Sequence, residues 1–312
     1  MQVRPCRDAD SADVLALINA AAAADGTPRM TGPILSDLLR RAPGSHSMAQ
    51  SALVTDQNGA PLGFGWWAVG GSRGQTIRFE GWVHPRHRRR GVGTALLVAA
   101  EAYARDQIGG GARIAARGYA DIPGLLPLFQ LRGFEVIRRF LRMEVTLVGH
   151  TACSEAWADP PPGIILDRFR PEDLEALVEA DNAIFANHWG AVPRTVAAWR
   201  REMIEARPHD PELWIIARTA DGAIVAECLC HASRDGAPDD GWISIVGVRP
   251  EWRGRGLGRA VLCKGLAVLQ AAGYRTAGLH VDAENVAAIG LYHGVGMALA
   301  RQRLHFMKVL DG

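Results

Sequence analysis

The hydrophobic and polar positions of the chain follow one order of elements, and the chain runs through this order twice. In the second pass, a short apolar run at 164–166 leads into a segment where Leu174, Leu177, Val178 and Asp181 recur at helical spacing. A more irregular helical stretch comes next. Each pass is therefore predicted to open with a strand and an amphipathic helix.

Each pass continues with two strand-like runs on either side of a tight turn. The turns are an Asn-Gly pair at 58–59 and an Asp-Gly pair at 221–222, and these dipeptides are the strongest hairpin turn signals in a sequence. A third strand, ending at Val83 or Val248, leads into a glycine-rich turn and a long apolar helix. A strand, a short helix and a final strand follow. The order predicts a mixed sheet with helices on its faces.

Fixed offsets between the passes indicate that one domain is duplicated. Gly59 and Gly222 are separated by the same number of residues as Gly133 and Gly296. Before the second pass, a Pro-Pro-Pro-Gly run is typical of a stiff, extended linker. We therefore predict a first domain at 1–149, a linker at 150–163 and a second domain at 164–312.

Composition restricts the class of protein. The 312 residues are 48% hydrophobic and 22% charged, with a formal charge of +2, which fits a globular chain without a bias toward nucleic acid or membranes. The first residues lack the apolar core of a signal peptide, and we find no run of about 20 apolar residues. The five cysteines are few, odd in number and scattered, so we expect no disulfide framework and a cytoplasmic location.

Two glycine-rich turns carry the strongest chemical signal. Each follows a strand and opens a helix, where unpaired N–H groups and the helix dipole favour an anion. Glycines let the backbone approach such a ligand, and arginines add positive charge. The turns predict a pyrophosphate-bearing ligand. They read Arg88-Arg89-Arg90-Gly91-Val92-Gly93-Thr94 and Arg253-Gly254-Arg255-Gly256-Leu257-Gly258-Arg259.

The spacing of the glycines restricts the ligand. Leu96 and Val261 stand where a dinucleotide fingerprint needs a third glycine, and the Gly-Lys-Ser/Thr of a P-loop is absent. Both turns instead match Val-x-Pro-x-x-Arg-x-x-Gly-x-Gly, which resembles the acetyl-CoA motif of the GNAT superfamily of acetyltransferases. A nucleic-acid patch is the weaker interpretation of the arginine run at 86–90, because the run is short and the chain is neutral.

The resemblance covers nearly the whole chain, once per half. It implies an α+β fold of two tandem GNAT-like domains, each a mixed, mostly antiparallel sheet flanked by helices. It also implies acetyl-CoA as co-substrate, with its pyrophosphate on the turn and its pantetheine arm beside the preceding strand. The residues that would hold it are Val83 with Arg88 to Thr94 (Arg88, Arg89, Arg90, Gly91, Val92, Gly93, Thr94) in the first half, and Val246, Gly247, Val248, Arg253 to Arg259 and Asn285 in the second.

The halves differ where the family places its proton donor. Asn285 can cap a short helix on which Tyr292 follows, and this stretch resembles the family segment whose tyrosine protonates the leaving thiolate. The first half has Phe129 instead, on a segment broken by Pro123 and Pro127. We therefore expect the second half to catalyse and the first to be degenerate.

The general base is less well marked. The tandem layout resembles mycothiol synthase, but Trp242 stands where that family has a glutamate, which argues against a close mycothiol synthase. Glu227 and His231 are candidate bases, and a relay through water is also possible. His188, Trp189 and Trp242 are candidates for contact with the acceptor.

The sequence thus predicts an N-acetyltransferase that moves acetyl from acetyl-CoA to a primary amine of a small molecule by direct attack in a ternary complex. No metal is expected, because Cys228-x-Cys230 lacks further ligands at zinc spacing. Two alternatives stay open: an aminoglycoside-type antibiotic acetyltransferase, favoured by Asp235, Asp239 and Asp240, and a non-catalytic acyl-CoA binding protein. The sequence indicates neither the acceptor nor the oligomeric state.

Overall fold

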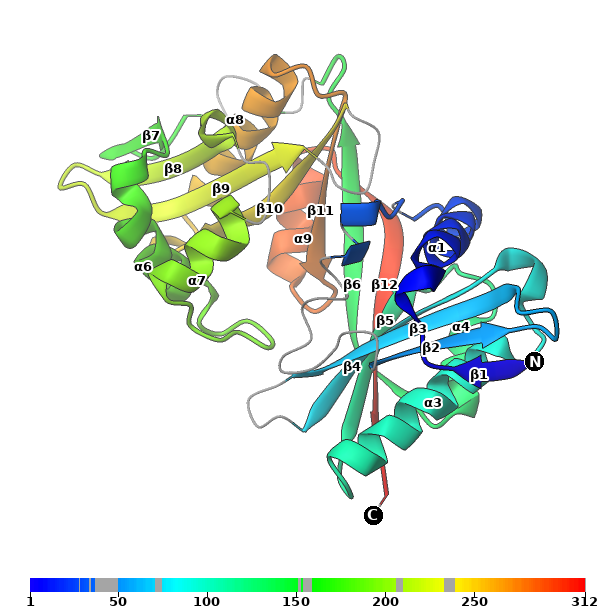
Figure 1. The fold of residues 1–312 in the computed structure, drawn as a ribbon. Helices are drawn as coiled ribbons and strands as arrows, with labels where there is room; N and C mark the ends of the chain where they lie inside the picture. Colours follow the sequence, from blue (N-terminus) through cyan, green and yellow to red (C-terminus); the bar gives the residue numbers. More distant parts are fainter. Residues whose placement is uncertain are drawn as a thin grey trace. The chain divides into compact units, whose positions relative to one another are not determined.

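The chain forms two compact units in a computed structural model (Figure 1). Unit 1 comprises Met1–Phe140 and Arg301–Gly312, and unit 2 comprises Leu141–Ala300. The structure describes residues 1–311 except 28, 34, 37–49, 71–74, 151–152, 154–158, 206–209 and 233–238. Asp235 therefore lies outside the described residues.

Unit 1 is a mixed sheet in the order β1-β2-β3-β4-β5-β12, with all pairs antiparallel except β4 with β5. Its elements are β1 (Gln2–Arg4), α1 (Ser11–Asp25), β2 (Ser51–Thr55), β3 (Pro61–Gly70), β4 (Thr76–Val83), α3 (Val92–Gln107), β5 (Arg113–Tyr119), α4 (Leu125–Leu131) and β12 (Ala298–Val309).

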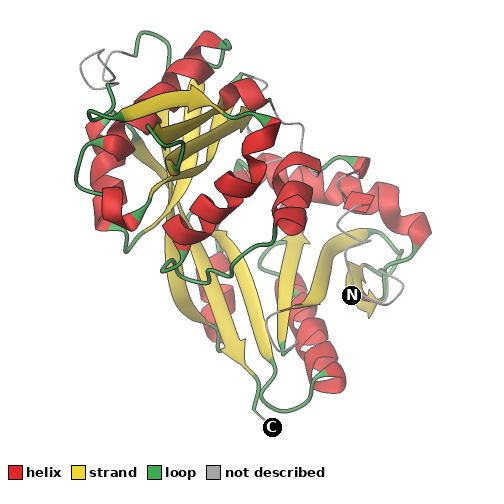
Figure 2. Cartoon of the chain, turned by 90° about the vertical axis from the view of Figure 1, so that its left-hand side faces the viewer, coloured by secondary structure: helices red, strands yellow, loops and turns green. Residues whose placement is uncertain are grey.

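Unit 2 repeats this plan in the order β6-β11-β10-β9-β8-β7, again with one parallel pair, β10 with β11. Figure 2 shows helices and strands alternating through the chain. The predicted α+β fold with a mixed, mostly antiparallel sheet is confirmed. The elements are β6 (Glu135–Thr146), β7 (Ile164–Arg168), α6 (Leu174–Phe185), α7 (Val196–Arg200), β8 (Trp214–Thr219), β9 (Ile224–Ala232), β10 (Asp240–Val248), α8 (Leu257–Ala271), β11 (Thr276–Asp282) and α9 (Val286–Gly294).

The hairpins form where the Asn-Gly and Asp-Gly pairs predict them. Gly59 and Gly222 have φ of 87° and 89°, the left-handed backbone that glycine adopts without a Cβ penalty. The helical spacing at the start of the second pass is also confirmed, since α6 buries Leu177, Val178 and Asp181 against the sheet.

The final strand of each unit comes from the other half of the sequence. Residues 303–309 of β12 pair antiparallel with 113–119 of β5, so the C-terminal strand completes unit 1. The end of β6 lies beside β11 in unit 2, where the Leu147 N–H donates to the Arg275 carbonyl at 2.8 Å. The units therefore differ from the ranges 1–149 and 164–312, because sheet pairing crosses the sequence repeat.

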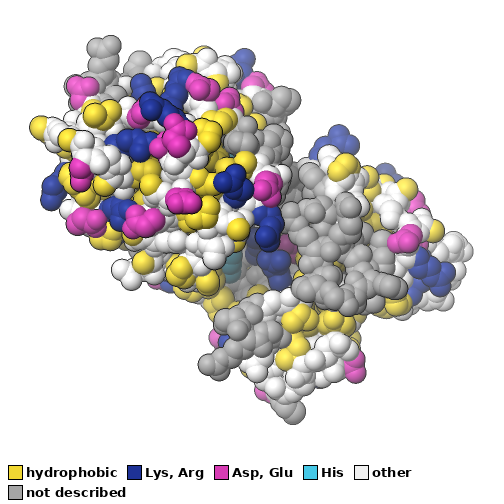
Figure 3. Space-filling model, turned by 60° about the vertical axis from the view of Figure 1, so that its left-hand side comes forward, with side chains coloured by type: hydrophobic (Ala, Val, Ile, Leu, Met, Phe, Trp, Pro, Cys, Tyr) yellow, Lys and Arg dark blue, Asp and Glu magenta, His cyan; other side chains and the backbone are white. Residues whose placement is uncertain are grey.

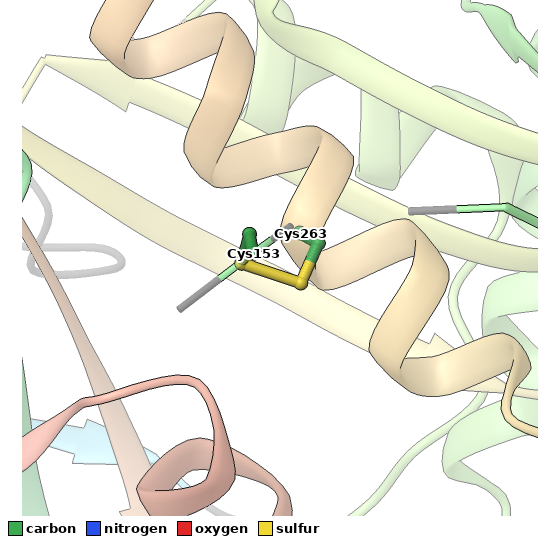
Figure 4. The surroundings of a disulfide bond; sticks show 2 residues. All are labelled: Cys153 and Cys263. Atoms are coloured by element: carbon green, nitrogen blue, oxygen red, sulfur yellow. A yellow bond between two sulfur atoms is a disulfide. The ribbon is translucent and has the colours of Figure 1, made fainter. Parts of the chain in front are cut away.

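A disulfide in unit 2 joins Cys153 to Cys263 of α8, with Cα atoms 5.3 Å apart (Figure 4). This bond departs from the expectation that the scattered cysteines form no disulfide framework; the two residues are 110 positions apart in the sequence. Cys6, Cys228 and Cys230 are free and buried. None of the helices in the described part of the chain combines the length and the apolarity that a membrane crossing requires.

Phe306 of β12 tests the exchanged strand. Its side chain is fully buried and stacks on Phe129 with ring centroids 4.4 Å apart, inside the core of unit 1. Phe306→Ala should lower the free energy of unfolding by about 3–5 kcal/mol, through lost burial and a cavity. Urea denaturation would measure this loss, and hydrogen exchange should place it at the amides of β5.

Leu299→Ala is the control for this change, because Leu299 lies on the same strand but is 55% exposed. It should shift stability by no more than about 0.5 kcal/mol. Faster exchange at β11 rather than β5 in the Phe306 variant would contradict the strand assignment.

Candidate functional site

The glycine-rich turn of unit 2 leaves open space at the start of α8. Gly254 and Gly256 have φ of 75° and 80°, and a Cβ added to either would meet no atom within 4 Å. Gly256 is the N-cap of α8, a helix of 15 residues whose first N–H groups have no partner inside the helix. This geometry suits an anion such as a pyrophosphate.

Arg253 belongs to the packing of this turn. Its Nε donates to the Val248 carbonyl and its Nη2 to the Ile184 carbonyl, both at 3.0 Å. Arg88 in unit 1 is held in the same manner, with an added ion pair to Asp25 at 2.7 Å. The two arginines thus fix each turn against its preceding strand.

The turn of unit 1 departs from this arrangement. Arg89 replaces the first glycine and has φ of +60°, a conformation that is unfavourable for a side chain. A Cβ added at Gly93 would lie 2.8 Å from Leu128, whereas at Gly258 the same atom would lie 3.4 Å from Leu291. The turn of unit 1 is therefore more crowded at Gly93, although a Cβ added at Gly91, as at Gly256, would meet no atom within 4 Å.

The parallel strands of unit 2 separate beside the turn. β10 pairs with β11 only from Asp240 to Trp242, while β10 continues to Val248. The pairing of β10 with β9 is irregular between Ile243 and Ile245, at Ser244. The separation leaves the β11-facing edge of Val246, Gly247 and Val248 beyond the parallel pairing, where a ligand could add a strand-like partner.

Tyr292 lies on α9, which Asn285 caps by accepting from the Ala288 N–H at 3.1 Å. Its side chain is buried, and burial, with Cys228 adding a smaller effect, raises the pKa of the phenol. It is therefore protonated at neutral pH and able to donate. In unit 1, Phe129 lies on the shorter helix α4, as its prolines predict.

The two faces of β9 carry different chemistry. Cys228 and Cys230 point toward Gly265 of α8. Glu227 and His231 alternate with them along the strand and so point to the opposite face, where α6 packs. This face holds the candidate acceptor site.

A cavity of about 370 Å³ lies on this face within unit 2. Trp242 and Phe185 form aromatic walls, and the Trp242 ring meets His280 edge-on at 4.9 Å. The polar lining consists of Asp181, Arg194, Glu202, Ser244 and His280. This cavity opens to the surface and its lining is mainly polar, which suits a small polar ligand.

The structure brings some of the predicted acceptor and base residues together. Trp242 lines the cavity, whereas His188 and Trp189 are not among its lining residues. His188 packs edge-on against Phe185, and burial lowers its pKa. Trp189 is 46% exposed.

His231 reaches the cavity through a neighbour. Its Nδ1 donates to the Ala232 carbonyl at 2.6 Å, which leaves Nε2 to accept from the Ser244 hydroxyl. Ser244 lines the cavity and His231 is buried behind it.

Glu227 is fully buried beside Asp181. Neither of its carboxyl oxygens, nor Oδ1 of Asp181, has a hydrogen-bond partner among the residues that the structure describes. Oδ2 of Asp181 accepts from Nη2 of Arg194 at 2.5 Å, and Nη1 of Arg194 contacts Glu202 at 3.3 Å. Desolvation and the neighbouring Asp181 carboxylate raise the pKa of Glu227 well above its usual value.

Sequence reasoning missed all five polar residues of the cavity lining: Asp181, Arg194, Glu202, Ser244 and His280. One signal was present, because Asp181 is an acidic residue on the apolar face of a helix. Asp239 and Asp240, which favoured an acidic acceptor cleft in the sequence, do not line the cavity as described. The Thr276 hydroxyl donates to Asp240 at 2.5 Å, and Asp239 lies 3.9 Å from Arg275.

Comparisons with known proteins agree with this geometry. The profile of the Acetyltransferase (GNAT) family matches residues 26–134 and again 174–297. A mycothiol acetyltransferase from Nocardiopsis dassonvillei is 32% identical, over 92% of this chain and 89% of its own. Another from Geodermatophilus obscurus is 33% identical, over 93% of each chain.

Solved structures show the same tandem fold. A GCN5-related N-acetyltransferase from Sphaerobacter thermophilus matches with a TM-score of 0.75 and 27% identity, over 100% of this chain and 96% of that chain. A tandem GNAT protein from the clavulanic acid biosynthesis pathway matches with a TM-score of 0.73 and 19% identity, over 99% and 98%. In the part of the chain that the structure describes, no cluster of side chains could hold a metal ion.

Glu227 makes stability depend on pH in a defined direction. Its carboxyl has an ordinary pKa of about 4.3 when unfolded and a raised pKa when folded, so the folded state binds more protons in between. Stability should therefore fall as pH rises above about 5, by up to ~1.4 kcal/mol per pH unit. Glu227→Gln should remove this decline, which urea unfolding at several pH values would measure.

Glu101 of unit 1 offers a matched control, because its replacement should change stability at neutral pH in the opposite direction. It is also buried, but it accepts from Arg132 at 2.6 Å and Lys308 at 2.9 Å. Glu101→Gln should destabilise the protein at neutral pH by about 3–5 kcal/mol, because two cations lose their partner. If raising the pH made the wild type more stable than the Glu227→Gln variant, the expected protonation of Glu227 would be excluded.

Proposed function

Because the chain belongs to the Acetyltransferase (GNAT) family and is an acetyl-CoA-dependent N-acetyltransferase acting on a small-molecule amine, we propose that unit 2 alone performs the transfer. The observation that carries this proposal is the coincidence, in one unit, of the open turn at Gly256, Tyr292 and the polar cavity. Unit 1 lacks the phenol and has the crowded turn.

The proposed step is direct attack of the amine on the thioester carbonyl carbon. The turn at 254–258 holds the pyrophosphate, and the edge of β10 near Val246–Val248 holds the pantetheine arm. The C–N bond forms, the C–S bond breaks, and Tyr292 gives its proton to the departing thiolate. The amine arrives as an ammonium and must lose a proton, for which Glu227, or His231 through Ser244, is positioned on the opposite face.

Unit 1 supports this division of labour. Its residue at the position of Gly247 is Trp82, whose ring stacks on Phe64 at 6.0 Å. These rings occupy the face on which unit 2 has its cavity. Unit 1 therefore has an apolar core in place of an acceptor site.

The acceptor is proposed from the relatives. Proteins named mycothiol acetyltransferase align along almost the whole chain, so the amine acceptor of those enzymes is the first to assay. Trp242 replaces a glutamate of that family, so we expect the deprotonating group to differ. The aminoglycoside-type alternative has less support, because the relatives named above are not of that class and both charge signs mix on the surface in Figure 3. A cytoplasmic location, and the expectation of no nucleic-acid or membrane partner, stay predictions.

Gly256→Glu tests the pyrophosphate turn. The change places a side chain and a negative charge in the open space before α8, so affinity for acetyl-CoA should fall by at least about 10²-fold. Gly256→Ala is the control for backbone strain at φ of 80°. Calorimetry with acetyl-CoA would measure both variants.

The same change in unit 1, Gly91→Glu, should leave most acetyl transfer intact. Equal losses of activity from the Gly91 and Gly256 variants, with both proteins folded, would show that the two units share the reaction.

Tyr292→Phe tests the proton donor. Removing the hydroxyl should lower kcat by roughly 10²-fold, while acetyl-CoA affinity changes little, because the phenyl ring retains the packing. Thiol release at saturating acetyl-CoA would measure kcat. Full turnover by the variant would mean that the thiolate is protonated by another group.

A further inference from the structure

The two units share a frame that allows residue-by-residue comparison on the acceptor face. In unit 1, Asn19 exchanges two hydrogen bonds with the backbone of Met30, at 2.9 and 2.7 Å. In unit 2, Asn182 exchanges the same pair with the backbone of Arg194, at 2.9 and 2.8 Å. Met30 and Arg194 therefore occupy equivalent positions.

Two further positions follow from the same frame. The residues before the two asparagines are Ile18 and Asp181. Phe64 pairs with Leu53 across the strands of unit 1, as Glu227 pairs with Ile216 in unit 2. Phe64 and Glu227 are thus equivalent as well.

At these three positions, unit 1 is apolar and unit 2 is charged. Ile18 and Phe64 belong to one buried core with Met30 packed against it. Unit 2 has Asp181, Arg194 and Glu227 instead. The fold does not need charge here, and burying carboxyl groups without full pairing costs stability. The charged set therefore points to a function.

The geometry shows what this set lacks. Asp181 is 2% exposed and lines the cavity, yet its Oδ1 has no partner among the described residues. One guanidinium, that of Arg194, faces two buried carboxyl groups and also Glu202. A cationic group that enters the cavity would supply the missing partner.

We propose that Asp181 binds the ammonium group of the acceptor and receives its proton, with Glu227 as a second carboxyl that shares this proton behind it. The inference rests on the proposed function and names the residue that the acceptor amine touches. Asp181 is then a catalytic residue, and Glu227 and Arg194 are positioning residues.

The step balances without another reactant. The N–H bond of the ammonium breaks, its proton moves to the carboxylate of Asp181, and the freed lone pair attacks the thioester carbon. The thiolate takes the Tyr292 proton, and the attacking nitrogen then loses its second proton, which returns to the Tyr292 phenolate. The net products are therefore the amide, the thiol and one proton. That proton leaves the carboxyl pair to solvent before the next cycle.

Other titratable groups face this pair. Arg194 comes from the loop after α6, and Glu202 from the π-helical segment Arg201–Glu205 after α7. Cys228 of β9 points to the opposite face but adds to the charge effect on Glu227. His280 of β11 lines the cavity, and His231 of β9 lies behind Ser244. Arg194 donates to Asp181, while burial and the neighbouring Asp181 carboxylate raise the pKa of Glu227.

Two nucleophiles distinguish chemistry from structure. A panel of amino sugars and alkylamines, protonated at neutral pH, needs a base, whereas hydroxylamine is mainly neutral there and does not. Asp181→Asn should lower kcat/KM with the best panel amine by about 10²–10³-fold at pH 7, and by less than about tenfold with hydroxylamine. Raising the pH should restore activity with the amine, and Asp181→Glu should restore part of it at pH 7.

A variant that carries the unit 1 residues in unit 2 tests the charged set in a protein that should still fold. The triple variant D181I, R194M and E227F places the apolar set of unit 1 in unit 2. Replacing a buried ion set by apolar residues is often neutral or stabilising, so this variant should fold and bind acetyl-CoA. It should lose transfer to panel amines. Asp173→Asn, which removes an aspartate paired with Arg218 outside the cavity, is the activity control.

The outcomes distinguish a failure of this inference from a failure of the proposed function. Equal losses with amine and hydroxylamine in folded Asp181→Asn, or retained amine transfer in the triple variant, would overturn the role of Asp181. A wild type that binds acetyl-CoA but acetylates neither the panel amines nor hydroxylamine would overturn the proposed function, and the inference with it. Unequal losses, together with recovery at high pH, are the expected result.

Discussion

The separation of two parallel strands is the constraint on which the site of unit 2 depends. β10 and β11 stay paired for only three residues, so the sheet is open between the helices of one face and those of the other. A thioester that lies in this opening can meet Tyr292 from the α9 side and an amine from the α6 side. The proposed acid, Tyr292, and the proposed base therefore lie on opposite sides of the thioester, so their proton transfers take place apart.

Much of the fold could be predicted from the sequence. The Asn-Gly and Asp-Gly turns, the amphipathic α6 and the two glycine-rich turns all formed where local physical rules placed them. The exchange of β6 and β12 was not, because strand partners depend on long-range pairing rather than on local pattern. The pairing of Cys153 with Cys263 is hidden for the same reason.

The site divides in the same manner. A glycine turn before a helix has a local signature, so Gly254 and Gly256 could be predicted from the sequence. Asn285 and Tyr292 were predicted from the resemblance of their segment to that of the GNAT family. The cavity is assembled from α6, β9, β10 and β11, and no short motif joins Asp181 to Glu227. Arg253 shows that a motif can also mislead. Its position in the motif predicts contact with the ligand, but its guanidinium donates to two backbone carbonyls.

The exchanged strands have a consequence for how the protein is made. Arg113 pairs with Val309, so the sheet of unit 1 has an unpaired edge until β12 has left the ribosome. The first half therefore cannot finish folding before all of unit 2 has been synthesised, although it is made first. Its edge strand β5 stays available to other chains during that interval, and a second nascent copy could supply the same strand. The two units thus complete their folding together, because the strand that closes unit 1 follows the whole of unit 2 in the chain.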